Sequence, residues 1–230
     1  MNYDGELAAG RIVRVVGDLI VDVKDRNDKE EPAFCGAVEI AEMCKPEMQV
    51  LLVKAKDNQK IIKKNVLFVK TDDGWILADP KYNRSLFKEA FSQRKMQDFA
   101  EYKSYRPLKA EEAGGIDFEL SGEKGEKAFV FVTSIYHQKD GYAIFPQKIN
   151  FFEIKMLEAL QQKIANGAKG YIMMIAPREN CTKAKFVWDI DPTAAAAMYD
   201  AKQSGVNFIC YGCKIEDDGI SLGDRMEISF

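Results

Sequence analysis

The stretch GGIDFELSGEKGEKAFVFVTSIYH, residues 114–137, reads as two β-strands joined by a turn rich in glycine and charge. The first strand carries a carboxylate, Asp117, among apolar neighbours. The second strand places Phe131 and Thr133 on one face, because side chains two residues apart point the same way. Two short apolar runs around a Gly-containing turn predict a strand pair. This pair begins a segment of alternating strands and helices, which follows a β-rich N-terminal segment.

The residues before the pair predict a small antiparallel β-barrel or sheet. GRIVRVVGDLIVDVKD (10–25) alternates apolar and polar residues. MQVLLVKAKD (48–57) and KNVLFVKTDDGWILADP (64–80) follow, with turn signals at Asp57-Asn58 and Asp73-Gly74. Many short strands with tight turns are typical of such folds. A helix is predicted from Asn83 onward, and the charged residues 101–113 are predicted to be a connector.

The residues after the pair predict a mixed sheet flanked by helices. Asp191-Pro192 predicts a helix start, because the Asp carboxylate can accept first-turn amide bonds and Pro suits the first helical position. The expected elements are strand 127–136, helix 148–166, strand 169–177, short strand 184–188, a helix from 192 and a last clear strand 206–215. We therefore predict an α+β or α/β fold divided as a small antiparallel β-barrel 1–82, a helix and connector 83–113, and a mixed-sheet α/β domain 114–230.

Composition limits the function classes. The 230 residues carry a net charge of −3 and include one histidine. A negative net charge argues against strong general affinity for nucleic acid, which depends on cation–phosphate contacts. One histidine excludes sites that need two. Without an apolar run of membrane-spanning length or an apolar N-terminal leader, the sequence predicts a cytoplasmic protein with no membrane association.

The strand pair resembles the metal site of one large class of nucleases, but its chemical groups differ. In that class an Asp on the first strand and Glu-x-Lys on the second hold Mg²⁺ and place a cation near the developing charge. Here Phe131 and Thr133 replace the Glu and Lys. Since losing a single such donor commonly costs about 3 kcal/mol, we predict no catalytic residues, no cofactor, and Asp117 as a remnant.

Two other interpretations of Asp117 remain open. Glu119 shares its strand face, so Asp117 and Glu119 could form a relocated Mg²⁺ site in a nuclease with displaced carboxylates. The simpler interpretation is that Asp117 is a solvated strand-end carboxylate or caps a neighbouring loop.

Scattered motifs resemble the sugar fermentation stimulation protein A family over roughly residues 10–225. They are IVDV (20–23), the spacing of Cys35 and Cys44, LFKEAF (86–91), IDF (116–118), GYAIFP (141–146), and DP (191–192) followed by Ala201, Gly205-Val206 and Tyr211. The resemblance implies an N-terminal OB-like barrel, a C-terminal PD-(D/E)xK nuclease-like domain, and DNA binding. The family's polar motifs depart here: its Glu-Val-Lys becomes Phe131-Val132-Thr133, and the Arg before Ile-Asp-Phe becomes Gly115.

The densest positive run, residues 54–70, holds six lysines and one aspartate. On an OB-like barrel such a hairpin could follow a phosphate backbone, and the alternative is a solvated hairpin whose lysines protect its edges. The predicted nucleic-acid-binding residues are Lys54, Lys56, Lys60, Lys63, Lys64 and Lys70. The leading hypothesis is thus a pseudoenzyme that binds DNA weakly. The second is a protein-interaction or regulatory module that uses the apolar former active-site face, its partner being another protein or a second copy in a homodimer. The third is the relocated Mg²⁺ nuclease.

Overall fold

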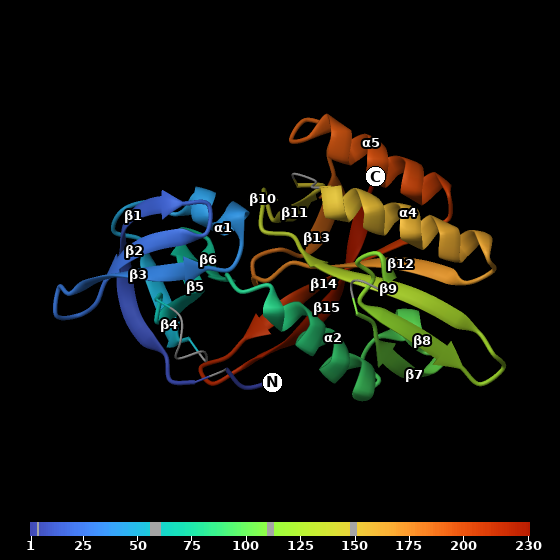
Figure 1. The fold of residues 1–230 in the computed structure, drawn as a ribbon, viewed down its shortest axis with the longest axis horizontal. Coiled ribbons are helices and arrows are strands. Elements are labelled where there is room, and N and C mark those ends of the chain that lie inside the picture. The colour runs from blue at the N-terminus through green and yellow to red at the C-terminus, as the bar shows by residue number, and fades with distance from the viewer. Residues whose placement is uncertain (4, 56–60, 110–112, 148–150) are drawn as a thin grey trace. The chain divides into compact units, whose positions relative to one another are not determined.

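The computed structural model describes residues 1–3, 5–55, 61–109, 113–147 and 151–230. These residues form two compact units, shown in Figure 1. The first unit contains Met1–Tyr82, Pro177–Asn180 and Cys213–Ser221, and the second contains Asn83–Ala176, Cys181–Gly212 and Leu222–Phe230. The chain therefore leaves the first unit at Tyr82 and returns to it twice.

The first unit is a β-barrel with one additional strand. Its elements are β1 (Ala8–Gly17), β2 (Ile20–Lys24), β3 (Glu30–Cys35), α1 (Val38–Met43), β4 (Gln49–Lys54), β5 (Lys64–Thr71) and β6 (Gly74–Leu77). The sheet order is β3-β2-β1-β4-β5-β6, and β3 also pairs with β5. That pairing closes β1 to β5 into a five-stranded barrel, the size of an OB-type barrel, and confirms the predicted architecture.

The barrel closes because alternate side chains are apolar. Ile12 on β1, Val50 on β4 and Val69 on β5 are buried inside, at 0–1% exposure. Their sequence neighbours Arg11 and Gln49 are exposed on the outside. This alternation fixes the strand register, since a one-residue slip would bring charged groups into the barrel.

The second unit is a mixed sheet with helices on both faces. Its elements are α2 (Lys81–Ser92, which begins in the first unit), η1 (Gln97–Phe99), β7 (Tyr102–Pro107), β8 (Phe118–Gly122), β9 (Lys127–Ser134), β10 (Gln138–Lys139), β11 (Tyr142–Phe145), α4 (Phe151–Ala165), β12 (Lys169–Ile175), β13 (Lys183–Phe186), α5 (Pro192–Gln203), β14 (Asn207–Ile215) and β15 (Ile220–Ser229). The strand order is β10-β11-β13-β15-β14-β12-β9-β8-β7. In Figure 1, α4 and α5 cover one face of this sheet and α2 lies against the other.

Several predicted elements agree with the structure and several strands were not anticipated. The β8–β9 pair is antiparallel, as predicted. Helix α5 begins at the predicted cap, where the Asp191 carboxylate accepts from the backbone amides of Thr193 and Ala194 at 3.0 and 3.1 Å. Strand β7 lies within the predicted connector, and β10, β11 and β15 were missed.

In the part of the chain that the structure describes, no helix combines the length and apolar character needed to cross a membrane.

Candidate functional site

The β8–β9 pair places Asp117 at the start of the first strand. Phe118 pairs with Val130 and Glu119 with Phe129, and the Asp117 amide donates to the Val130 carbonyl at 3.0 Å. Asp117 is only 9% exposed. The side chain is therefore fixed at a strand end, and it is not the solvated carboxylate of the simpler interpretation.

Both oxygens of the Asp117 carboxylate have partners within the protein. Oδ2 accepts a hydrogen bond from the Val132 amide at 2.8 Å, and Oδ1 lies 2.7 Å from Nε of Arg84 on α2. Burial raises the pKa of Asp117, whereas the Val132 amide and the Arg84 charge oppose that rise. A protein cation thus neutralises the carboxylate that the nuclease scheme gives to a metal ion.

Arg84 is held in place by several contacts and was missed by sequence reasoning. Its guanidinium donates to the carbonyl oxygens of Leu108 and Asp117 at 3.1 and 3.4 Å and lies 5.7 Å from the centre of the Phe118 ring. The helix that carries it docks through Phe87, whose ring stacks on Phe118 at 4.4 Å. Nothing in the local sequence distinguishes Arg84 from a surface arginine, because its partner is 33 residues away.

Phe131 and Thr133 lie on the face of β9 that α4 covers. Phe131 is partly buried and packs against the apolar core cluster of the second unit, which includes Leu157 and Leu160 of α4. Phe129, on the same face, is 8% exposed, with the Lys163 ammonium 4.7 Å from its ring centre. This face of β9 is therefore largely core.

Glu119 forms ion pairs with cations other than Arg84. Its carboxylate lies 2.5 Å from Arg106 Nη2 and 2.8 Å from Lys127 Nζ. Lys127, and then Arg106, lower the pKa of Glu119. Asp117 and Glu119 thus each bind separate cationic partners.

These donors do not fit a divalent cation. Mg²⁺ and Ca²⁺ bind six or more converging oxygen atoms, whereas both Asp117 oxygens already have protein partners and Phe131 offers no oxygen. Within the described ranges, no group of three His, Cys, Asp or Glu side chains is arranged to hold a metal ion.

A small polar network lies at the end of β9. The Ser134 hydroxyl donates to Oδ1 of Asn83 at 3.0 Å, and both residues are buried. Gln147 Oε1 accepts from the amides of Tyr136 and His137 at 2.7 and 3.1 Å. These contacts satisfy polar groups that would otherwise be costly to bury.

The structure gathers some of the predicted lysines and separates others. Lys54 and Lys64 are cross-strand partners on β4 and β5, and Lys64 lies 2.5 Å from Glu31. Lys63 is exposed beside them. Lys70 lies at the other end of β5, with its ammonium 5.2 Å from the Trp75 ring centre. Lys56 and Lys60 lie outside the described residues.

Fold and site together define a two-part protein: an OB-type barrel joined to a mixed-sheet α/β domain. Residues 81–219 match the family model for the sugar fermentation stimulation protein RE domain. The chain belongs to the sugar fermentation stimulation protein family.

Relatives and a solved structure agree with this assignment. The sugar fermentation stimulation protein homolog of Roseobacter denitrificans is 28% identical, with 99% of each chain covered. The homolog of Paramagnetospirillum magneticum is 28% identical over 77% of this chain and 76% of its own. Pyrococcus furiosus SfsA, solved in complex with Ca²⁺, superposes with a TM-score of 0.86 at 18% identity and covers 100% of this chain and 98% of its own. At that identity the similarity describes the fold.

Proposed function

We propose that this chain is a cytoplasmic protein that binds nucleic acid weakly and does not hydrolyse it. The observation that carries the proposal is the Asp117–Arg84 pair, at 2.7 Å, in the position where the nuclease scheme requires a metal ion. A Ca²⁺ ion such as the one named for the Pyrococcus furiosus structure would have to displace Arg84. It would then find Asp117 as its one carboxylate ligand here, so most of its six or more oxygen ligands would have to be water.

Binding is assigned to the lysine end of the barrel. Lys54 and Lys64 stand directly opposite each other, and like charges opposite each other destabilise a sheet. Glu31 offsets one of these charges. A phosphate near Lys54 and Lys64, which Lys63 adjoins, would offset the other. The overall charge of −3 keeps the expected affinity weak and sensitive to salt.

The charge reversal Lys63→Glu/Lys64→Glu is expected to weaken DNA binding by about tenfold at low salt, because two phosphate contacts become repulsive. Fluorescence anisotropy of labelled duplex and single-stranded DNA at two salt concentrations measures the effect. Lys124→Glu/Lys139→Glu is the matched control, because it makes the same charge change at exposed positions of the second unit. Equal losses in both variants would contradict assignment to the hairpin.

The wild-type protein is expected to leave DNA intact with Mg²⁺ or Mn²⁺ present, as followed on a denaturing gel. Metal-dependent cleavage that disappears in Asp117→Ala would establish the relocated-carboxylate nuclease instead. Salt-insensitive association with a protein, and no DNA binding, would favour the interaction module. That module has less support, because Phe129 and Phe131 are packed in the core.

A further inference from the structure

One cross-strand row of side chains runs over the outer face of the barrel. Arg11 on β1 pairs with Lys24 on β2 and with Gln49 on β4. Lys70 on β5 pairs with Trp75 on β6. Since Val50 pairs with Val69, Gln49 and Lys70 are the next partners outward on β4 and β5. The row is therefore Lys24, Arg11, Gln49, Lys70 and Trp75.

Four of the five residues of the row line an open hollow. Arg11, Lys24, Gln49 and Trp75 all contribute to a cavity of about 650 Å³ in the first unit. The next residues along each strand point into the barrel core, so these side chains point outward. Trp75 is half-buried. Its indole is held by an edge-to-face contact with Phe68, at 6.4 Å between ring centres, and by the Lys70 ammonium.

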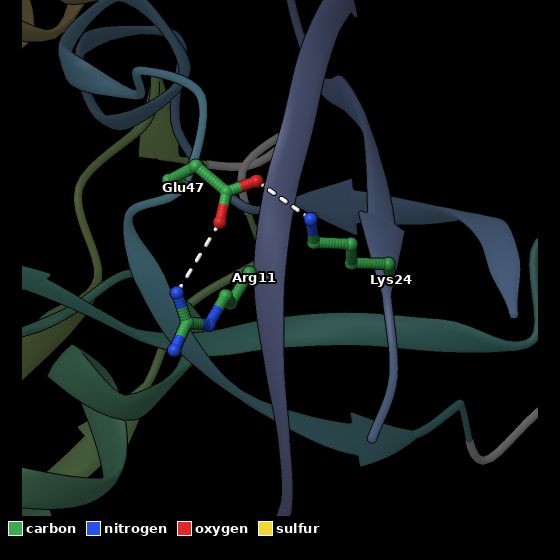
Figure 2. Close-up of polar contacts among 3 residues, drawn as sticks. All are labelled: Arg11, Lys24 and Glu47. Carbon is green, nitrogen blue, oxygen red and sulfur yellow. Dashed lines mark hydrogen bonds and ion pairs between the residues drawn. The ribbon is translucent and has the colours of Figure 1, made fainter. Parts of the chain in front are cut away.

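At the Lys24 end of the row, Lys24 and Arg11 both contact the carboxylate of Glu47. Glu47 accepts from Lys24 Nζ at 2.6 Å and from Arg11 Nη1 at 3.2 Å, as Figure 2 shows. Glu47 has a φ of +69°, a conformation that costs a non-glycine residue energy. All three side chains are at least one-quarter exposed. A carboxylate bridging two exposed cations occupies the place where a phosphate could bind.

A second carboxylate of the hollow, that of Asp25, forms hydrogen bonds with the backbone of its own turn. Asp25 accepts from the amides of Asn27 and Lys29 at 2.8 and 3.1 Å. It therefore stabilises the turn between β2 and β3, and it lines the same cavity as Asp28 and Arg26. Glu47 is the carboxylate that contacts the row itself.

We propose that this row binds a short single-stranded nucleic-acid segment, with one base stacked on Trp75 and phosphates on Lys70, Arg11 and Lys24. Adjacent strands lie about 4.8 Å apart, so the four steps from Lys24 to Trp75 measure about 19 Å along the curved surface of the sheet, enough for a few nucleotides. An aromatic ring with cations in line suits unpaired bases, because a duplex hides the base faces. The proposal rests on the proposed function but uses residues other than Lys54, Lys63 and Lys64.

Removing the negative charge of Glu47 should strengthen nucleic-acid binding. Glu47→Gln frees Arg11 and Lys24 for phosphate and is expected to tighten binding of a ten-nucleotide dT strand about threefold. Trp75→Ala is expected to weaken binding about tenfold, because base–aromatic stacking is lost, whereas Trp75→Phe should retain part of the affinity. The matched control is Glu123→Gln, which removes a carboxylate paired with Lys103 in the second unit.

Fluorescence anisotropy of a labelled strand measures the affinity of every variant. Stacking is followed separately in the full chain with Trp188→Phe, which leaves Trp75 as the one tryptophan. The dT strand should quench Trp75 fluorescence, and an abasic strand with the same phosphates should bind with little quenching. Thermal melting verifies that each variant is folded. The contrary result is a dT strand that binds without quenching Trp75, and with the same affinity in Glu47→Gln and Trp75→Ala as in the wild-type sequence at these positions. That result would overturn this inference and leave the proposed function standing. Equal quenching by duplex DNA, or dTMP binding as tightly as the strand, would also overturn it. If no nucleic acid binds at low salt, both this inference and the proposed function are wrong.

Discussion

Phe87→Ala is expected to lower the free energy of unfolding by about 3–5 kcal/mol. Phe87 has no exposed surface. Its ring stacks on Phe118 at 4.4 Å and meets Phe99 edge-on at 5.7 Å. Removing the ring leaves a cavity among rigid aromatic neighbours that cannot collapse to fill it. Phe87 also lies one turn after Arg84 on α2, so the same change loosens the support of the Asp117 partner.

Urea unfolding followed by circular dichroism measures this loss. Phe87→Leu should cost clearly less, because most of the volume is kept. The exposed Ser92→Ala on the same helix should change the free energy of unfolding by no more than about 0.5 kcal/mol. A loss below about 1 kcal/mol in Phe87→Ala would show that α2 does not dock through this ring.

Arg84→Gln is expected to destabilise the protein by about 2 kcal/mol at neutral pH. It leaves the buried Asp117 carboxylate with one hydrogen bond and no counter-charge. The Arg84 side chain is 46% exposed, so the loss should fall below that for a fully buried pair. Burial already raises the pKa of Asp117, and removing Arg84 should raise it further.

The sign of the pH dependence follows from that raised pKa. Between the ordinary carboxyl pKa and the raised one, the folded state binds more protons than the unfolded state, so stability falls as pH rises through this window. The deficit of Arg84→Gln should therefore shrink as the pH is lowered through the raised pKa. Urea titrations at several pH values measure it, and Arg84→Gln/Asp117→Asn should remove this added dependence. An unchanged pH profile in Arg84→Gln would show that the carboxylate does not depend on the guanidinium.

Arg84→Gln also bears on catalysis. It frees one Asp117 oxygen while Phe131 and Thr133 remain, so the expected result is still no Mg²⁺-dependent cleavage. Cleavage gained in this variant would mean that Arg84 alone blocks a working site.

Sequence patterns predicted the elements whose apolar residues repeat regularly. The barrel strands, the β8–β9 pair and the cap at Asp191 all carry local signals. Strand β7 carries little such signal, because most of its residues are exposed at the edge of the sheet. Strand β15 interrupts its apolar residues with Gly223, Asp224 and Arg225, which favour a turn over a strand.

The candidate sites were predictable only in part, for a related reason. Asp117 could be found because it sits beside a strand with an identifiable pattern. Arg84 could not, because its pairing depends on how α2 docks. Likewise, Lys70 was found as part of a charge run, but its alignment with Trp75 and Arg11 depends on the register of five strands. Register is a property of the assembled sheet.

The return of the chain to the first unit has a consequence for the order in which the protein forms during synthesis. The Tyr3 hydroxyl donates to the carbonyls of Glu216 and Gly219 at 2.6 and 2.5 Å, and the Leu77 amide donates to the Pro177 carbonyl at 2.9 Å. A ribosome reaches residues 213–221 only after nearly all of the second unit has been made. The strands β1 to β5 can pair early, whereas Tyr3 and Leu77 have only water as a partner for these hydrogen bonds until residues 177–219 have been made.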